Sequence, residues 1–365
     1  MIKILYLVSN FRRTGPTRQL LNIVSNLDRS VCEISVLSLS PEPEDSMIGD
    51  FRSLQINISS LALSRFKGFF YADNKVRSHI LTAQADIIHS QGIRPDMIAS
   101  KIQDRHVVST IRNDPRVDYP LKFGKFIGSQ MAGKHLKVMR KLKHPVACSQ
   151  SLAEDLKSKY GISAACIQNG VDTEKYSPAG KAEKAKLREK LGLEKAGKYF
   201  LTAGSLIPRK NIEILIRAFL KYSGGNLLVL GDGPEKEKLT ALCKDRQNIH
   251  LAGNAGNADE YMKAADFYLS ASTGEGLPNT VLEAISSGLP VVVSDIAPHR
   301  EIFAKTDHQY FFPPGDEKAL IHLIGEINKD DHAALQKKMR STAEGNFNAK
   351  FMAAKYQDLY FKLLS

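Results

Sequence analysis

The sequence predicts an α/β protein with two doubly wound domains, each built on a parallel sheet. Short apolar segments alternate with helical stretches in the first half of the chain, and the same alternation restarts after residue 170. The 365 residues, 43% of them hydrophobic, exceed what one ordinary core accommodates. Turn-forming Asn-Gly and Ser-Pro pairs within 167–180 place the boundary between the two domains.

The first domain is expected to span residues 1–168. Its strands are nearly continuous apolar runs, which suit a parallel sheet that is buried on both faces. Apolar residues at helical spacing predict a helix over 18–27, after the first strand. The expected strands are 2–8, 31–39, 86–89, 106–111 and 145–149.

The second domain is expected to span residues 169–350, and its ligands should bind beyond the carboxyl ends of the strands. The charged segment 181–195 is predicted to be a solvated helix, and the amphipathic segment 351–364 a helix that could pack across either domain. The expected strands are 198–205, 226–232, 249–253, 266–272 and 290–295, with helices at 211–222, from about Asn279, and at 319–327.

The composition indicates the cellular compartment in which the protein is expected. No run of about 18 uncharged apolar residues occurs, so no transmembrane helix is expected. The apolar start of the chain precedes Arg12 and Arg13, which is the reverse of a signal peptide, and it is expected to be a buried strand. Four scattered cysteines without a Cys-x-x-Cys site favour free thiols in a reducing cytoplasm.

The positive charge is concentrated in the first half of the chain. The net charge is +12, and residues 1–165 carry 24 Lys/Arg against 14 Asp/Glu. Such a field favours an anionic partner, which could be a phosphorylated substrate, an acidic lipid headgroup or a nucleic acid. No stacking-aromatic or helix-turn-helix signature is present, so a nucleic acid is not the predicted partner.

Two glutamates flank a loop-to-helix junction in STGEGLPNTVLEAISSG (272–288). Asn279 is expected to cap the helix, whose first N–H groups then attract anions or polar oxygens. Glu275 at the loop tip and Glu283 inside the helix could accept hydrogen bonds from paired hydroxyls of a ribose or a sugar. The alternative is that Glu283 only favours the helix dipole and Glu275 is a loop charge.

A basic pair follows a strand in LTAGSLIPRKN (201–211). Arg209 can hold a diphosphate through paired hydrogen bonds and Lys210 as a point charge. The alternative is a solvated basic helix start, although positive charge at a helix N-terminus opposes the dipole.

Two glycine-bearing turns are less informative. Gly-Asp-Gly at 231–233 permits a tight strand-to-helix turn, for which a structural role is sufficient. Gly15, after the first strand, would let the backbone approach a phosphate. Neither Gly-x-Gly-x-x-Gly nor a P-loop occurs here, so nicotinamide enzymes and P-loop NTPases have no fingerprint in this loop.

The motifs of the second domain occur in a recognisable order: SLIPRKN before a helix, then GDGP, then EGLPNTVLEAISSGLPVVVSD. Together with QNGVD (168–172), this series resembles family 4 of the retaining glycosyltransferases, of the "glycosyl transferases group 1" type, over essentially the whole chain. The resemblance implies a GT-B fold, with two facing Rossmann-like domains and a C-terminal helix (351–365) that packs back on the first.

The resemblance also implies roles for the conspicuous residues. Glu275 and Glu283 match the family's Glu-x7-Glu motif, so Glu275 would lie beside the donor sugar and Glu283 would hold the ribose. Arg209 and Lys210 match the basic pair on the donor diphosphate. The backbone around Gly276, Leu277, Pro278 and Asn279 would approach the sugar and phosphate, and Asn254 in AGNAG would border the nucleobase.

The first domain matches the family pattern less closely. Gly15 precedes Pro16 where the family's phosphate loop is often Gly-Gly. His89 matches a family histidine and is a candidate catalytic residue; the alternative is a histidine that is hydrogen-bonded in the core. Gln91 replaces the second histidine of the family pattern. Arg112 is a candidate donor-binding residue and stands where many members carry histidine. These departures leave the acceptor and sugar contacts open.

The function implied is transfer of a sugar, with retention, from a nucleotide-diphosphate sugar to a hydroxyl of a glycan or lipid-linked acceptor in bacterial surface polysaccharide synthesis. A UDP-sugar is the expected donor. No Asp-x-Asp occurs, and the family works without a metal, so neither metal nor cofactor is expected. The alternatives are a sugar-nucleotide epimerase of the same fold and a non-catalytic binder of an anionic ligand.

A basic segment, 116–145, predicts a membrane contact. It carries eight Lys/Arg and one acidic residue, interleaved with apolar side chains. This is the profile of a surface helix at an anionic membrane, here the inner face of the plasma membrane. The alternative is a helix whose apolar residues face the sheet and whose lysines are solvated.

Overall fold

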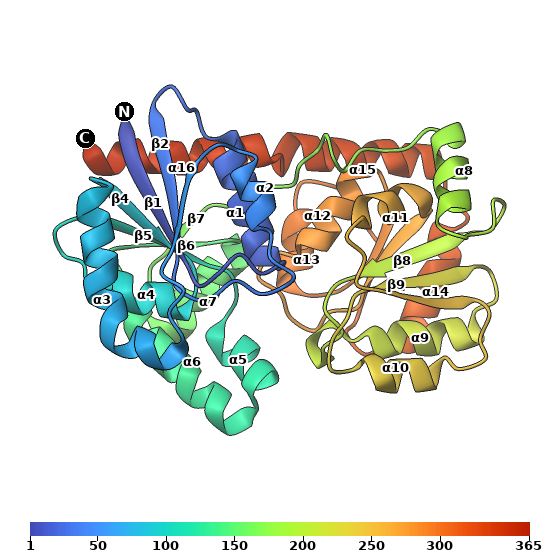
Figure 1. Cartoon of the computed structure of the whole chain (residues 1–365). Helices are drawn as coiled ribbons and strands as arrows, with labels where there is room; N and C mark the ends of the chain where they lie inside the picture. The colour runs from blue at the N-terminus through green and yellow to red at the C-terminus, as the bar shows by residue number, and fades with distance from the viewer. The chain divides into compact units, whose positions relative to one another are not determined.

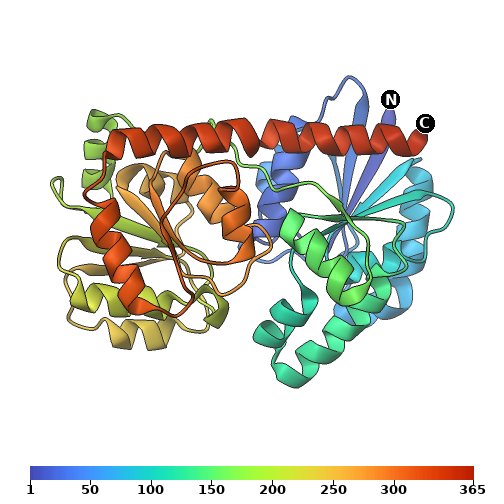
Figure 2. The same ribbon diagram turned by 180° about the vertical axis from the view of Figure 1, so that it is seen from behind.

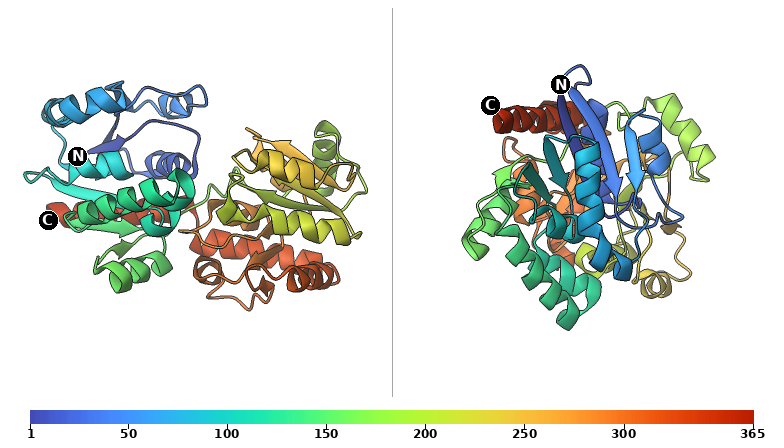
Figure 3. Two further views of the ribbon diagram at one scale, coloured as in Figure 1. Left: turned by 90° about the horizontal axis from the view of Figure 1, so that it is seen from below. Right: turned by 60° about the vertical axis from the view of Figure 1, so that its left-hand side comes forward.

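The structure is a computed structural model that describes the backbone of residues 1–365 and all side chains except those of 65–69. The chain divides into two compact units. Unit 1 consists of Met1–Gly170 and Ala349–Ser365, and unit 2 consists of Val171–Asn348. The sequence analysis placed these two boundaries after residues 168 and 350. In each unit a sheet lies between layers of helices (Figure 3).

Unit 1 is built on a seven-stranded sheet with the order β3-β2-β1-β4-β5-β6-β7, in which all pairs are parallel. Helices cover both faces of this sheet (Figures 1 and 2). Its elements are β1 (Ile2–Val8), α1 (Gly15–Asn26), β2 (Cys32–Ser38), α2 (Ile48–Arg52), β3 (Asn57–Ser60), α3 (Arg65–Thr82), β4 (Ile87–Ser90), α4 (Ile93–Ala99), β5 (His106–Ile111), α5 (Pro115–Phe123), α6 (Lys125–Met139), β6 (His144–Ala147), α7 (Gln150–Tyr160), β7 (Ala165–Cys166) and α16 (Ala349–Leu364).

Helix α16 is the C-terminal segment that the sequence predicted as amphipathic, and it belongs to unit 1. It packs against α1 and contributes Met352, Tyr356 and Tyr360 to the core that β1, β2 and α1 also line. Because this core takes side chains from both ends of the chain, unit 1 is complete only with α16 in place.

Unit 2 is built on a six-stranded parallel sheet with the order β10-β9-β8-β11-β12-β13. Helices α9, α10 and α14 pack on one another at one face, and α8, α11, α12 and α15 make up the other layer (Figure 1). Its elements are α8 (Lys181–Lys190), β8 (Tyr199–Ala203), a 3-10 turn (Pro208–Lys210), α9 (Ile212–Lys221), β9 (Asn226–Leu230), α10 (Lys236–Leu242), β10 (Ile249–Gly253), α11 (Ala258–Ala264), β11 (Phe267–Ser270), α12 (Asn279–Ser286), β12 (Val291–Ser294), α13 (Ala297–Ile302), β13 (Phe311–Phe312), α14 (Glu317–Ile327) and α15 (His332–Asn346).

The ten expected strands are all present, and the structure adds three. β3 is a polar, partly exposed strand at the sheet edge, whereas β7 and β13 are only two residues long, so none of them produces an apolar run. Two further expectations need correction. The basic segment 116–145 forms two helices that break at Gly124, where φ is +82°. Helix α12 is preceded by Pro278 in the cap position, so Asn279 is its first residue and not its cap.

Candidate active site

Unit 2 has its topological switch point between β8 and β11. These neighbouring strands are the two from which the chain proceeds in opposite directions across the sheet. Loops that follow such strands diverge and leave a crevice at their carboxyl ends, where open α/β sheets bind ligands. The loop after β8 carries the basic pair, and the loop after β11 carries Glu275.

Glu275 binds both members of the basic pair. The Arg209 Nη1 atom lies 2.5 Å from Glu275 Oε2 and also donates to the Gly274 carbonyl at 2.5 Å. The Lys210 Nζ atom lies 2.6 Å from Glu275 Oε1. The three side chains are only 10%, 15% and 6% exposed for Arg209, Lys210 and Glu275. We call these three residues the Glu275 cluster.

The Glu275 cluster holds a permanent negative charge against two positive ones. Burial alone would raise the pKa of Glu275, but the charges of Lys210 and Arg209, with hydrogen bonds from Lys210 and Ser272, lower it to about 2. One positive charge remains in excess. The cluster is therefore suited to an anionic ligand that can replace or join the carboxylate on the two cations.

Glu283 lies in the second turn of α12 and is 5% exposed. Tyr268 connects it to the Glu275 cluster electrostatically. Burial raises the pKa of Tyr268, and the charges of Glu283 and Glu275 raise it further, so both carboxylates act on the same buried phenol. The Tyr268 hydroxyl donates to the Ala203 carbonyl at 3.2 Å, across the switch point. The structure thus brings both predicted glutamates to this edge of the sheet.

The Gly-Asp-Gly turn supports the loop of the basic pair. Gly231 has a φ of +141°, and a Cβ atom there would lie 1.8 Å from the Gly204 carbonyl oxygen. The Leu206 N–H donates to the Asp232 carbonyl at 2.9 Å. The turn after β9 therefore packs directly on the loop after β8, a contact that only glycine allows at residue 231.

Comparisons with known proteins agree on one family. The model of the glycosyl transferases group 1 matches residues 183–345, and that of glycosyltransferase family 4 matches residues 13–175.

The chain belongs to the group 1 glycosyltransferases.

Named relatives of this glycosyltransferase cover different shares of the chain. An O-antigen biosynthesis glycosyltransferase of Escherichia coli, WclY, is 26% identical over 99% of both chains. The UDP-Gal:alpha-D-GlcNAc-diphosphoundecaprenol alpha-1,3-galactosyltransferase of E. coli is 29% identical over 54% of each chain. Anabaena HepE in complex with UDP-glucose has a TM-score of 0.83 at 17% identity, covering 99% of this chain and 100% of that one. This structural likeness shows the GT-B fold.

The remaining unit 2 residues predicted for the donor site differ in exposure. Gly276, Leu277 and Pro278 form the segment that leads into α12 and are buried, and Asn279 is half-buried. Asn254 is exposed and directly follows β10, the edge strand two positions from β8. All of them lie beyond the carboxyl ends of the strands of the glycosyltransferase's second unit.

Three polar residues that the sequence analysis missed form a chain of hydrogen bonds that ends at Glu275. Ser272 Oγ donates to Glu275 Oε1 at 2.7 Å, and Ser294 Oγ donates to the Ser272 carbonyl at 2.5 Å. His299 Nδ1 lies 2.7 Å from the Ser294 carbonyl, and burial lowers the pKa of His299 to about 4. The available signal was the position of Ser272 just after β11 and of Ser294 at the end of β12. His299 lies within α13 and carried no such signal. Among the described side chains, no group of three or more His, Cys, Asp and Glu could hold a metal ion.

In unit 1 the glycosyltransferase buries His89 completely. Its Nδ1 lies 2.6 Å from the Tyr360 hydroxyl, and its Nε2 lies 2.7 Å from Thr110 Oγ1. Thr110 in turn contacts the Tyr356 hydroxyl at 2.8 Å. Burial, with a smaller contribution from Arg112, lowers the pKa of His89 to about 3. This geometry favours the alternative of a core histidine, which here joins β4 and β5 to α16.

The other two unit 1 candidates lie beyond the carboxyl ends of strands of that sheet. Gly15 begins α1, after the loop that follows β1. Arg112 directly follows β5 and is half-buried. Its guanidinium donates from Nη1 to Asn169 Oδ1 at 2.6 Å and from Nη2 to Gln91 Oε1 at 3.3 Å.

Proposed function

We propose that this glycosyltransferase moves a sugar, with retention of configuration, from a UDP-sugar to a hydroxyl of a glycan or lipid-linked acceptor in bacterial surface polysaccharide synthesis. The names of its relatives support this: one acts in O-antigen biosynthesis, and another is named for a UDP-galactose donor and a diphosphoundecaprenol acceptor. The observation that carries the proposal is the Glu275 cluster at the switch point of unit 2.

In the proposed reaction, Arg209 and Lys210 bind the donor diphosphate. As the bond between sugar and phosphate lengthens, negative charge accumulates on the leaving diphosphate and positive charge on the sugar. Cations that are already fixed in a largely buried site stabilise this leaving group more effectively than solvent does. No Asp-x-Asp occurs in the sequence, and two fixed cations can supply the charge that a Mg²⁺ ion would otherwise bring.

Glu275 and Glu283 have separate roles in this proposal. When the diphosphate binds, it competes with Glu275 for Arg209 and Lys210, and the released carboxylate accepts hydrogen bonds from the sugar hydroxyls. Glu283, one helical turn further from the loop, accepts from the ribose hydroxyls. The acceptor hydroxyl attacks from the face of the leaving group, and its proton passes to the departing phosphate oxygen, so no carboxylate nucleophile is needed.

The alternative of a sugar-nucleotide epimerase is not favoured, because WclY and the E. coli galactosyltransferase are both named as glycosyltransferases. Incubation of the donor without acceptor separates the two activities. An epimerase converts the sugar under these conditions, whereas a transferase leaves the donor intact apart from slow hydrolysis.

Calorimetry with UDP, GDP and ADP tests the proposed donor site. We expect selective binding of UDP that persists in EDTA, and loss of that binding in Arg209→Gln/Lys210→Gln/Glu275→Gln. The triple variant removes both cations together with the carboxylate, so that no buried charge is left unpaired. Binding of none of the three nucleotides by the folded wild type would defeat the proposal.

The hairpin of α5 and α6 is the proposed membrane contact. Its apolar side chains divide into two groups: Leu136 and Met139 are buried, whereas Phe123, Phe126 and Ile127 are 38%, 76% and 60% exposed. The sequence left two alternatives for this segment, a membrane-facing helix and a helix whose apolar residues face the sheet, and each of them describes part of it. The exposed tip, flanked by the exposed Lys122 and Lys125, combines the apolar and cationic chemistry of an interfacial helix. No helix among the described residues is long and apolar enough to cross a membrane.

A buried polar chain fixes this hairpin to the sheet. Asp96, 1% exposed, accepts from Ser90 and Ser109 at 2.5 and 2.7 Å and lies 2.9 Å from His135 Nε2 of α6. The other nitrogen of His135 lies 2.7 Å from the Tyr119 hydroxyl of α5. Because both helices are held in this way, the exposed tip has a defined orientation on unit 1.

Co-sedimentation with liposomes tests the membrane contact. We expect retention on vesicles that contain anionic lipid at low salt, little retention on neutral vesicles, and loss of retention in Phe126→Ser/Ile127→Ser. Equal retention on both kinds of vesicle, or none on anionic ones, would contradict it.

A further inference from the structure

The carboxyl edge of the unit 1 sheet carries a small group of polar side chains. Gln91 directly follows β4, Arg112 directly follows β5, and Asn169 lies in the segment after β7. Arg112 occupies the centre, because its two terminal nitrogens donate to Gln91 Oε1 and Asn169 Oδ1. In parallel sheets this is the edge at which ligands bind.

The hydrogen-bond chemistry fixes which way the Gln91 amide faces. A guanidinium group has only donors, so the amide must turn its oxygen toward Arg112. Its Nε2 atom is then directed elsewhere, and it is buried without a hydrogen-bond partner among the described residues. The same holds for the Nε atom of Arg112. Gln91 as a whole is 8% exposed.

The charge of Arg112 is not balanced locally. Within the described part of the chain, its guanidinium donates to two neutral amide oxygens and to no carboxylate. Its field reaches the interior, where it adds to the effect of burial in lowering the pKa of His89. A partly buried cation without an anion is unfavourable unless a ligand supplies the opposite charge.

The unsatisfied groups indicate what such a ligand must offer. Arg112 Nε and Gln91 Nε2 are both N–H donors, so the ligand must present acceptor oxygens, and the uncompensated charge favours a negative one. An ammonium group, an apolar group or a hydroxyl acting as donor would satisfy none of these requirements. Arg112 is half-buried, so part of its side chain reaches solvent. Its Nε atom and Gln91 Nε2 are covered, so a ligand contacts these two donors only after neighbouring side chains move aside.

We infer that Arg112 and Gln91 form an oxyanion subsite in unit 1, which binds a carboxylate or phosphate group carried by one of the substrates. The inference rests on the proposed transfer reaction only for the identity of that substrate. The subsite makes an acidic substrate the preferred one, because a neutral sugar leaves the charge of Arg112 uncompensated.

Ligand-dependent thermal stability tests the subsite in the full-length chain. The background is Arg209→Gln/Lys210→Gln/Glu275→Gln, which removes the anion site of unit 2. The probes are glucuronate, glucose 1-phosphate and neutral glucose at constant ionic strength. Since a ligand that binds only the folded state raises Tm, we expect glucuronate or glucose 1-phosphate to raise Tm and glucose to leave it unchanged. The probe that acts shows whether the group is a carboxylate or a phosphate.

Two variants in that background separate the subsite from general salt effects. Gln91→Glu places a carboxylate beside Arg112, so it should raise Tm without ligand and abolish the response to either anion. Arg112→Gln should weaken anion binding roughly ten- to hundredfold, the effect of one charge-assisted hydrogen bond. Lys157→Gln, an exposed residue of α7, removes one charge from unit 1 and should leave the response unchanged.

The outcomes are decisive for the subsite and independent of the donor site. No Tm response to either anion in the background protein, or a response that survives both Gln91→Glu and Arg112→Gln, would overturn the inference. Binding of UDP by the wild type is measured separately, so a failed donor site leaves these results interpretable.

Discussion

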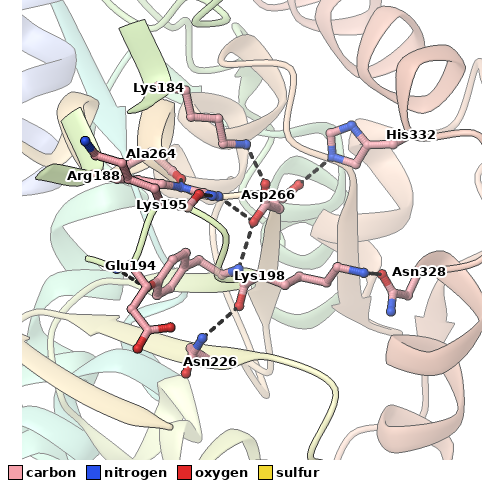
Figure 4. Close-up of polar contacts among 11 residues, drawn as sticks. Lys184, Arg188, Glu194, Lys195, Lys198, Asn226, Ala264, Asp266, Asn328 and His332 are labelled. Atoms are coloured by element: carbon pink, nitrogen blue, oxygen red, sulfur yellow. Dashed lines mark hydrogen bonds and ion pairs between the residues drawn. The ribbon is translucent and has the colours of Figure 1, made fainter. Parts of the chain in front are cut away.

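Strand β11 of unit 2 has a cluster of one carboxylate, one arginine and one lysine at each of its ends. At the amino end, Asp266 lies 2.6 Å from Lys184 Nζ and 2.7 Å from Arg188 Nη2, and it also accepts from the Tyr199 N–H at 2.8 Å (Figure 4). At the carboxyl end, the Glu275 cluster has the same three kinds of side chain at similar distances. Composition and net charge therefore do not distinguish the two.

The difference lies in what the cations are bonded to. Each nitrogen of the Arg188 guanidinium donates to an oxygen of unit 2: Nε to the Ala264 carbonyl, Nη1 to the Lys195 carbonyl and Nη2 to Asp266. The guanidinium also lies 5.0 Å from the centre of the Tyr199 ring. This cluster ties α8 to the amino ends of β8 and β11, where parallel sheets do not bind ligands.

The cations of the Glu275 cluster instead lie on loops beyond the carboxyl ends of the same two strands. Their main anionic partner, Glu275, is a side chain that a diphosphate can replace. Under the proposed function, one ion-pair chemistry stabilises the fold at one end of the strand, and the same chemistry binds substrate at the other end. Four predictions test that division, in order of expected effect.

Substitution of the arginine should separate activity from stability most clearly. Arg209→Gln removes a fixed donor from the leaving diphosphate, so we expect kcat to fall by about 10²–10³. Its Tm should change by only a few degrees. The matched variant Arg188→Gln should keep kcat/KM per folded molecule within about threefold. Steady-state kinetics of sugar transfer from a UDP-sugar measure the activity of both variants. Equal losses of activity would contradict the proposed difference between the two clusters.

The amino-end cluster should dominate stability. Asp266→Asn leaves Lys184 and Arg188 without their carboxylate, and we expect the free energy of unfolding to fall by about 2–4 kcal/mol, less than for a fully buried pair because Asp266 is 19% exposed. Urea titration followed by circular dichroism measures this. If Arg209→Gln proved as destabilising as Asp266→Asn, the Glu275 cluster would be structural too.

Low pH should lower the free energy of unfolding through His299, which lies near the carboxyl end of β11. This histidine is fully buried, and its folded pKa of about 4 lies below the ordinary 6.5. The unfolded chain therefore takes up a proton first, and the stability that neutral His299 contributes is present above pH 6.5 and lost as the pH falls toward 4. The loss is about 2–3 kcal/mol. His299→Gln should flatten the dependence of the unfolding free energy on pH in this window, and parallel curves for the two proteins would refute it.

The sequence was sufficient for the ten strands with apolar runs, and motif spacing was sufficient to select the residues of the Glu275 cluster as candidates. The direct ion pairs of Arg209 and Lys210 with Glu275 could not be predicted. They require β8 and β11 to be neighbours, and strand order is a property of the whole sheet. The contact between Arg188 and Asp266 could not be predicted for the same reason. Arg188 lies in a helix and Asp266 at the beginning of a strand, and no local pattern links two residues so far apart in the sequence.

His89 shows the limit of a motif match. Its strand position fitted a catalytic histidine, yet Tyr356 and Tyr360, which enclose it, come from the far end of the chain. The break at Gly124 was likewise hidden, because basic and apolar residues continue on both sides of it.

The prediction with the smallest expected effect tests most directly whether Glu275 competes with the diphosphate for Arg209 and Lys210. Glu275 binds Arg209 and Lys210. In the proposed mechanism the diphosphate takes these positions, so its binding displaces a carboxylate whose pKa the two cations lower to about 2. Glu275→Gln removes that competitor while keeping the size of the side chain. We expect UDP to bind about five- to tenfold more tightly, equivalent to roughly 1–1.4 kcal/mol. Transfer should nevertheless be slower, because an amide cannot replace the carboxylate that orients the sugar.

Asp266→Asn provides the matched control for this experiment. It neutralises a carboxylate with the same kinds of partner at the other end of β11, so the Kd for UDP should stay within about twofold of the wild type. Calorimetric titration of UDP into both variants gives the comparison. Weaker UDP binding in Glu275→Gln would mean that the carboxylate fixes the cations in place for the diphosphate and does not compete with it.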